Sequence, residues 1–139
     1  MKNLVFNHPF NKAKIKSRLL EDYDIHNGKL VIGVDFDNTI YDTHNVGGDF
    51  SCVIDLIKEC INMDMIICLY TSSQTYEDVE RKIDIFKDIF GKEPDYVNMS
   101  PLSIGADKPF FNILLDDRAG LKESWEVLYE VIQEKTINL

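Results

Sequence analysis

The sequence predicts an α/β protein with a mostly parallel sheet, and three observations support this prediction. Short apolar runs rich in β-branched residues alternate with longer segments of helical periodicity along the 139 residues. These runs show no alternation of polar and apolar residues, which is typical of strands buried on both faces of a parallel sheet. Three of the runs end in polar residues, and such sheets bind ligands at the carboxyl ends of their strands.

The first half of the chain predicts two helices and two strands. A basic helix is expected from Phe10 to Asp22, closing with a turn at Asn27–Gly28. The apolar run Leu30–Val34 predicts the first strand. Asp49 is the predicted N-cap of a helix that continues through Asn62, and Met65–Tyr70 predicts the second strand.

The second half continues the alternation. A helix is expected from Thr75 to Phe90, with Gly91 where a C-terminal cap belongs. Its predicted apolar stripe consists of Val79, Ile83, Phe86 and Ile89 or Phe90. Tyr96–Asn98 predicts a short third strand, Phe110–Leu115 a fourth, and Leu121–Lys135 the last helix. Strands that alternate with helices in this way favour right-handed crossovers in one sheet.

Length and composition predict one domain, residues 1–139, in which residues 1–28 form an N-terminal helical extension packed on the core. No apolar run approaches a membrane span, and no secretion signal is recognised. The three cysteines form no CxxC pair, so we expect reduced, buried thiols in a cytoplasmic protein. The net charge of −9 argues against non-specific binding to nucleic acid or anionic membrane.

The polar residues that follow the strands carry the chemical signal. The first strand runs into Asp35-Phe36-Asp37-Asn38-Thr39, the second into Thr71-Ser72-Ser73, and the fourth into Asp116-Asp117, with Lys108 shortly before the fourth. The four aspartates would meet at one edge of the sheet, where like charges destabilise one another unless a cation is present. Hard oxygen ligands of this kind favour Mg²⁺.

The order of these elements resembles the haloacid dehalogenase (HAD) superfamily over roughly residues 29–120. The DxDxT pattern of the family is matched by Asp35, Asp37 and Thr39, and its Thr or Ser after the next strand by Thr71. Its Lys or Arg is matched by Lys108, and its late acidic pair by Asp116 and Asp117. The resemblance implies a three-layer α/β/α, Rossmann-like core and a magnesium-dependent phosphatase.

Roles for the first two aspartates follow from chemistry and from this resemblance. Asp35 would attack phosphorus and form an aspartyl-phosphate, which splits one difficult displacement into two easier steps. Asp37 lies two residues on and points to the same side of the strand, so it can act as general acid and then as general base. In the family, the second Asp also offers its backbone carbonyl to the metal.

The remaining residues would hold the metal and the phosphate. Asp117, with Asp116, would anchor Mg²⁺ beside Asp35 and Asp37. The hydroxyl of Thr71 and the ammonium of Lys108 would hold the phosphoryl oxygens, with Ser72 and the backbone N–H of Phe36 as further substrate contacts. Many members of the family have Gly in place of Asn38, and Asn tolerates the same backbone angles.

The two gaps between the motifs are too short for the cap domains found in many members, so a capless protein is expected. An open site suits a large substrate such as a nucleic-acid end or a phosphoprotein. A nucleotide or another small phosphorylated molecule would need a loop or a second copy of the chain, as in a homo-oligomer, to cover the site. The segment Tyr41–Gly48 is where the family places a small flap, and His44 within it is either a substrate contact or a surface residue.

Three other functions compete with hydrolysis. A signalling receiver domain also gathers Asp, Thr and Lys on a parallel sheet, but its acidic pair comes first in the chain. A HAD-fold module without turnover would bind only metal and phosphate, although both Asp35 and Asp37 are present here. A DxD transferase leaves Thr71, Lys108 and the late acidic pair unexplained.

Overall fold

The computed structural model describes residues 11–101 and 109–137, which form four helices and four strands. The helices are α1 Lys12–Ile25, α2 Ser51–Asn62, α3 Tyr76–Phe90 and α4 Leu121–Ile137. The strands are β1 Val31–Asp35, β2 Ile66–Tyr70, β3 Tyr96–Val97 and β4 Ile113–Leu115. Each predicted element in these ranges is present, and its ends lie within three residues of the predicted ones.

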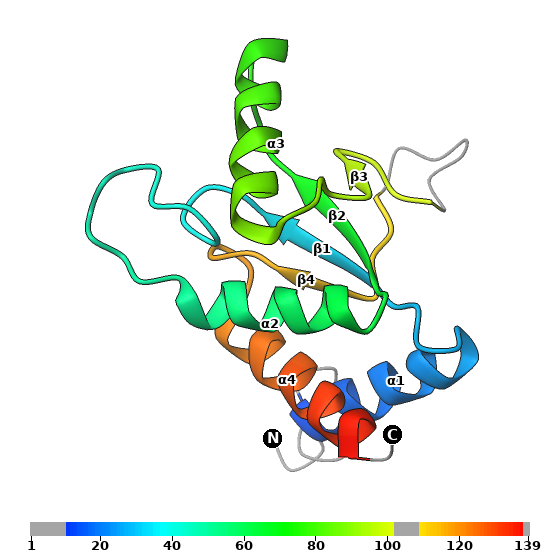
Figure 1. The fold of residues 1–139 in the computed structure, drawn as a ribbon. Helices are drawn as coiled ribbons and strands as arrows, with labels where there is room; N and C mark the ends of the chain where they lie inside the picture. The colour runs from blue at the N-terminus through cyan, green and yellow to red at the C-terminus, as the bar shows by residue number, and fades with distance from the viewer. Residues whose placement is uncertain (1–10, 102–108, 138–139) are drawn as a thin grey trace.

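The four strands form one parallel sheet in the order β3-β2-β1-β4 (Figure 1). The central strand β1 aligns Asp35 with Tyr70 of β2 and Val34 with Leu115 of β4. All carboxyl ends therefore lie at one edge of the sheet, as the sequence predicted. The α/β class and the parallel sheet flanked by helices are confirmed, and no cap domain is present among the described residues.

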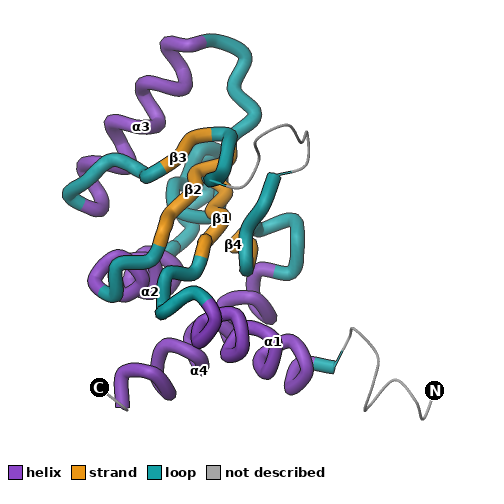
Figure 2. The backbone as a smooth tube through the Cα atoms, turned by 90° about the vertical axis from the view of Figure 1, so that its right-hand side faces the viewer, coloured by secondary structure: helices purple, strands orange, loops and turns teal. Residues whose placement is uncertain are grey.

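The core lies between one face of the sheet and the helices. Figure 2 shows α2 and α3 on one side of the strands. Alternate strand residues on that face are fully buried, namely Ile32, Val34, Ile67, Leu69 and Leu115. They pack in one cluster with Leu56 and Ile57 of α2, Phe86 of α3 and Leu128 of α4. Packed side chains cover the central strands and hold their ends in place. The backbone of the polar residues that follow these strands is therefore held in place as well.

The opposite face of β1 carries Gly33, and the absence of a side chain there has a packing reason. A Cβ atom at this position would lie 3.0 Å from Cδ1 of Phe111 and 3.1 Å from Cδ1 of Leu114. The ring of Phe111 therefore lies directly over the middle of the strand. Phe111 also contacts Tyr70 edge to face, with ring centroids 6.0 Å apart.

Helix ends follow local sequence signals with one correction. Gly91 ends α3 in the left-handed conformation at φ 78°, as predicted, and Thr75, the predicted first residue, is the N-cap that accepts the N–H of Asp78. The N-cap of α2 is Phe50 rather than the predicted Asp49. The carboxylate of Asp49, the residue before this N-cap, still accepts the N–H of Ser51 at 2.9 Å. It therefore satisfies one of the backbone N–H groups that lack a partner within the helix.

Helix α1 packs against α4 through ion pairs near both of its ends. Lys12 lies 2.6 Å from Glu126 of α4, and Asp24 lies 2.7 Å from Lys135. Between them Leu19 is buried in the core. None of the described helices has both the length and the apolar character that a bilayer crossing needs.

The cysteines are only partly as predicted. Cys60 and Cys68 are buried free thiols, whereas Cys52 is exposed. Burial raises the pKa of the Cys60 thiol to about 12 and that of Cys68 to about 11. The two buried thiols are therefore unreactive packing residues at neutral pH.

Candidate functional site

The chain makes a tight turn immediately after β1, and this turn sets the direction of Asp35 and Asp37. The N–H groups of Thr39 and Ile40 both point to the carbonyl of Phe36, and Asn38 donates its N–H to the carbonyl of Tyr41 at 2.8 Å. Asn38 has a φ of 58°, a left-handed conformation that Asn adopts more readily than most residues. The backbone of this turn is therefore one that both Asn and Gly can adopt.

The buried hydroxyl of Thr39 joins the end of β1 to the end of β4. It accepts the N–H of Asp117 at 3.0 Å and lies 3.2 Å from Oδ2 of Asp35 and 3.3 Å from Oδ1 of Asp117. A hydroxyl has one hydrogen, so it donates to one carboxylate at a time. Thr39 therefore acts as the link that holds these two aspartates together.

Asp35, Asp116 and Asp117 form a compact carboxylate cluster. One oxygen from each lies within 4.8 Å of the others. Burial, repulsion from Asp116 and a hydrogen bond with Asp117 raise the pKa of Asp35 to about 7. The cluster offers hard oxygen atoms and no His or Cys, which fits Mg²⁺ better than zinc. Three of the four predicted metal ligands are thus brought together.

The carboxylate of Asp37, the fourth predicted ligand, is not part of this cluster. It accepts a hydrogen bond from Thr43 at 2.6 Å and forms an ion pair with Lys82 at 3.1 Å. The structure therefore does not bring all four carboxylates together, whereas the metal contact expected from the backbone carbonyl of Asp37 stays a prediction. A general acid–base role is compatible with the observed position.

Lys82 is a site residue that the sequence interpretation missed. Its side chain is 6% exposed, and its ammonium donates to Oγ1 of Thr71 at 2.7 Å and to Asp37. The ammonium also lies 3.4 Å from Asp78 and 5.4 Å from the centre of the Phe36 ring. The sequence does contain an indication that Lys82 is buried. Position 82 is three residues after Val79 and four before Phe86, which places it on the predicted apolar stripe of its helix.

The other predicted substrate contacts have mixed outcomes. Thr71 is buried, and its backbone N–H donates to Oδ1 of Asn98 at 2.8 Å, which fixes the end of β2. Ser72 lines the same cavity as the carboxylate cluster. The side chain of Phe36 is fully buried in the core, which leaves only its backbone for ligand binding. Lys108 lies outside the described residues.

A cavity of about 500 Å³ opens between the carboxylate cluster and Lys82. The described residues that line it are Asp35, Asp37, Asn38, Thr43, His44, Ser72, Asp78, Arg81, Lys82, Asp116, Asp117 and Arg118. Hydrogen bonds from Ser73 and Arg81 lower the pKa of Asp78 to about 2, so this carboxylate is ionised at neutral pH. The volume falls within the range of about 300–1,000 Å³ that is common for small-molecule sites.

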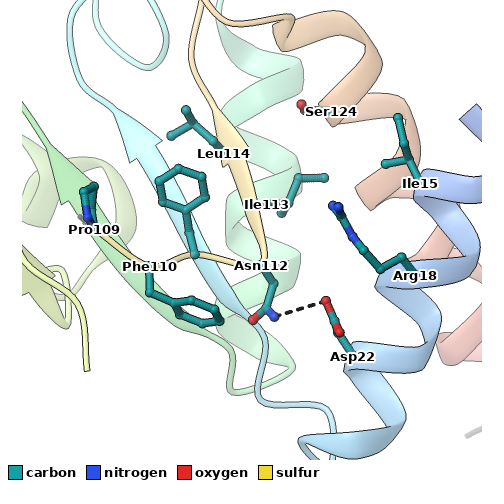
Figure 3. Close-up of a pocket in the computed structure, with 10 residues that line it drawn as sticks. Ile15, Arg18, Asp22, Pro109, Phe110, Asn112, Ile113, Leu114 and Ser124 are labelled. Carbon is teal, nitrogen blue, oxygen red and sulfur yellow. Dashed lines mark hydrogen bonds between the residues drawn. The ribbon is translucent and has the colours of Figure 1, made fainter. Parts of the chain in front are cut away.

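A larger cavity of about 640 Å³ lies away from these residues, between α1 and the segment that leads into β4 (Figure 3). Asp22 of α1 accepts a hydrogen bond from the side chain of Asn112 there, at 3.3 Å. Arg18 and Asp22 are its charged residues among those described. It has no carboxylate cluster, so we place the candidate site in the smaller, acidic cavity.

The fold and site define an α/β protein with an acidic cavity at the carboxyl ends of a parallel sheet. No family model matches the chain, and no curated protein matches it. The fold is similar to that of a solved protein from Bacteroides thetaiotaomicron that is described only as a conserved protein. The TM-score is 0.57 at 25% identity, over 77% of this chain and 92% of that chain. This similarity supports the fold.

Proposed function

We propose that the protein is a capless phosphohydrolase of the HAD type that hydrolyses phosphate monoesters with Mg²⁺ through an aspartyl-phosphate at Asp35. The observation that carries the proposal is that a carboxylate cluster with Asp35 and a buried ammonium, that of Lys82, line the same cavity. Asp35 is a member of the carboxylate cluster, and two residues later Asp37 is paired with Lys82. Phosphoryl transfer needs this combination of a cation site and a positioned ammonium.

Asp35, Asp116 and Asp117 are the residues that would hold the divalent cation. A bound Mg²⁺ would neutralise charge on the phosphate and on the nucleophile. The raised pKa of Asp35 explains why a cation is needed here, because without one this carboxyl is partly protonated at neutral pH and is a poor nucleophile.

In the first step, a carboxylate oxygen of Asp35 attacks phosphorus and forms the acyl-phosphate bond. The bond between phosphorus and the ester oxygen breaks, and protonated Asp37 gives its proton to the leaving oxygen. In the second step, ionised Asp37 takes a proton from water, whose oxygen attacks the same phosphorus. The bond between phosphorus and Asp35 breaks, and inorganic phosphate leaves. Asp35 is again a carboxylate, and Asp37 again carries its proton.

Lys82 and Thr71 supply the positive charge and the hydroxyl donor for the phosphoryl oxygens. Both groups are buried and already hydrogen-bonded to each other, so little reorganisation is needed when the substrate binds. In this proposal Lys82 has the phosphate-holding role that the sequence predicts for Lys108.

The test is phosphate release from a panel of esters, with Mg²⁺ and with chelator. The panel contains p-nitrophenyl phosphate, nucleotides, hexose phosphates, 3′- and 5′-phosphorylated oligonucleotides and a phosphopeptide. We expect metal-dependent release by the wild type and a loss of at least about 10³-fold in Asp35→Asn, which removes the nucleophile. Asp88→Asn on the exposed side of α3 is the matched control and should keep full activity.

Two outcomes would contradict the proposal. Wild-type activity in Asp35→Asn would exclude the aspartyl-phosphate. No release from any ester, although Mg²⁺ binds, would favour a HAD-fold module that binds metal and phosphate without turnover.

A further inference from the structure

The acidic cavity has an unusually polar wall. Every described residue that lines it is polar or charged, and none is aliphatic or a Phe, Tyr or Trp. Typical small-molecule sites are lined mostly by apolar and aromatic side chains. Such a wall offers no aliphatic side chain to a hydrophobic group and no Phe, Tyr or Trp ring on which a nucleobase stacks. It suits a ligand that is hydrophilic over its whole surface.

The cations on this wall differ in whether they are already paired. Lys82 is engaged by Asp37 and Thr71, and Arg81 donates to Asp78 at 2.9 and 3.3 Å. The guanidinium of Arg118, by contrast, has no hydrogen bond or ion pair with any described residue and is exposed at the cavity. It is therefore available to a ligand.

The backbone beneath Arg118 is nevertheless fixed. Its N–H donates to Oδ1 of Asp116 at 2.9 Å, within the turn that joins β4 to α4. The same turn carries Asp117, which is bound by Thr39. The guanidinium is thus carried by a backbone that is held next to the carboxylate cluster.

His44 lines the same cavity from a different element, the segment between β1 and α2. That segment is held by Asp42, whose carboxylate accepts the N–H groups of Val46 and Gly47 at 3.0 and 2.8 Å, and by the bond from Thr43 to Asp37. The imidazole of His44 is exposed and has no hydrogen-bond partner among the described residues. A second free donor therefore borders the cavity.

We propose that Arg118 and His44 form an anion subsite, and that the substrate is a small hydrophilic phosphate monoester with a second anionic group. This inference rests on the proposed function, because the first phosphate is the one transferred to Asp35. The second group is an oxyanion, a carboxylate or another phosphate, which the planar guanidinium of Arg118 can bind through two N–H groups. The subsite selects for this group and takes no part in bond breaking.

A simpler role for Arg118 would be to offset the negative charge of Asp116 and Asp117. The two roles differ in their consequences. An arginine that only balances charge would, when removed, tighten Mg²⁺ binding and leave the choice of ligand unchanged. An arginine that binds the second anion would, when removed, abolish the preference for doubly anionic ligands.

Binding of a matched pair of phosphonates tests the subsite without requiring turnover. 3-Phosphonopropionate carries a phosphonate and a carboxylate, whereas propylphosphonate has the same length and only the phosphonate. In calorimetric titrations with Mg²⁺, we expect the wild type to bind 3-phosphonopropionate about tenfold more tightly, the effect of one charge-assisted contact. Arg118→Gln should remove this preference, and His44→Gln should reduce it.

Lys122→Gln is the matched control, because Lys122 is 90% exposed in the first turn of α4 and outside the cavity. It should keep the preference of the wild type. Equal affinity for the two phosphonates, or a preference that persists in Arg118→Gln, would overturn the subsite. Failure of both ligands to bind would overturn it as well.

Hydrolysis of paired esters separates this inference from the proposed function. We compare glycerol 3-phosphate with 3-phosphoglycerate, and adenosine 5′-phosphate as the ester with a base. The subsite predicts the highest kcat/KM for 3-phosphoglycerate. This preference over glycerol 3-phosphate should be lost in Arg118→Gln through a higher KM for 3-phosphoglycerate, and it should persist in Lys122→Gln. Turnover of all esters at equal efficiency would leave the phosphatase intact and contradict the subsite.

Discussion

Two cavities lined by described residues differ in what their walls are made of, and the larger of the two is not the candidate site. The cavity between α1 and β4 has a volume of about 640 Å³ and a mixed wall, in which apolar residues lie beside Arg18, Asp22, Asn112 and Ser124. The cavity at the strand ends has about 500 Å³ and a wall of polar and charged residues. Only the second contains three carboxylates within 4.8 Å of one another.

This difference shows that strand direction locates the chemistry better than cavity size. The carboxyl ends of β1 and β4 bring Asp35 beside Asp116 and Asp117, and the end of β2 brings Thr71 to Lys82. Such a concentration of like charge costs free energy in the absence of a ligand, so its presence indicates a function. The larger cavity has no such cluster of like charges, since Asp22 is the one carboxylate among its described lining residues.

The largest expected effect after loss of the nucleophile comes from Lys82. Lys82→Met keeps the length of the side chain and removes the ammonium, so we expect kcat/KM to fall by about 10²–10³-fold, as when one transition-state donor is lost. Mg²⁺ should still bind, because its carboxylates form a separate cluster. Steady-state kinetics and calorimetric titration measure the two quantities.

Two matched variants sharpen this prediction. Lys87→Met, on the exposed side of the same helix, should keep full activity. Lys108→Met tests the residue that the sequence favoured for the same role. A large loss in Lys108→Met together with normal activity in Lys82→Met would show that Lys82 is a structural residue.

The carboxylate cluster predicts that stabilisation by Mg²⁺ depends on pH. The pKa of Asp35 is raised from an ordinary value near 3.8 to about 7, so the folded protein binds a proton more tightly than the unfolded chain between these values. Without metal, this group therefore lowers the stability as pH rises from about 4 to 7. Mg²⁺ requires the ionised form and should raise the Tm more at pH 8 than at pH 5.

Thermal unfolding in metal-free buffer and in Mg²⁺ measures this difference. In Asp35→Asn the gain in Tm should be smaller and should depend less on pH. A gain that is equal at pH 5 and pH 8 in the wild type would contradict the assignment of Asp35 to the metal cluster.

A smaller effect is expected at Asn38, where φ is 58°. Asn38→Gly adopts this conformation without strain, whereas Asn38→Ala does not, so we expect the alanine variant to be less stable than the glycine variant by about 1 kcal/mol. Urea unfolding of the two variants measures the difference. Equal stability would mean that the turn after β1 relaxes to a different backbone conformation.

The smallest effect is expected in the larger cavity. Arg18 is exposed there, far from the strand ends, and Arg18→Gln should leave kcat/KM within about twofold of the wild type. A strong loss of activity in this variant would break the distinction between the two cavities.

Most of the fold and half of the site could be predicted from the sequence because the signals are local. Apolar runs without alternation predict buried parallel strands, and Asp35, Thr71 and Asp116 directly follow three of them. Their convergence then follows from the topology of a parallel sheet. Strand β4 starts at Ile113, three residues later than predicted. At position 112 the side chain of Asn112, rather than its backbone, accepts the N–H of Val31 at 2.7 Å.

The rest of the site depends on contacts between distant segments. Lys82 was missed because a charged residue in an amphipathic helix is normally exposed, and only packing shows that its stem is buried with its ammonium facing Asp37. The direction of the Asp37 carboxylate could not be predicted from the sequence either. It is determined by contacts with Thr43 and Lys82, which are six and 45 residues away.

Trapping the covalent intermediate tests the central claim most directly. The enzyme is mixed with substrate and Mg²⁺, quenched with acid during turnover and treated with borohydride, which reduces an aspartyl-phosphate to homoserine. Peptide mass spectrometry then locates the modified residue. The account predicts homoserine at position 35 only when substrate and Mg²⁺ are both present. Phosphate release without modification of Asp35, or modification of another aspartate, would contradict it.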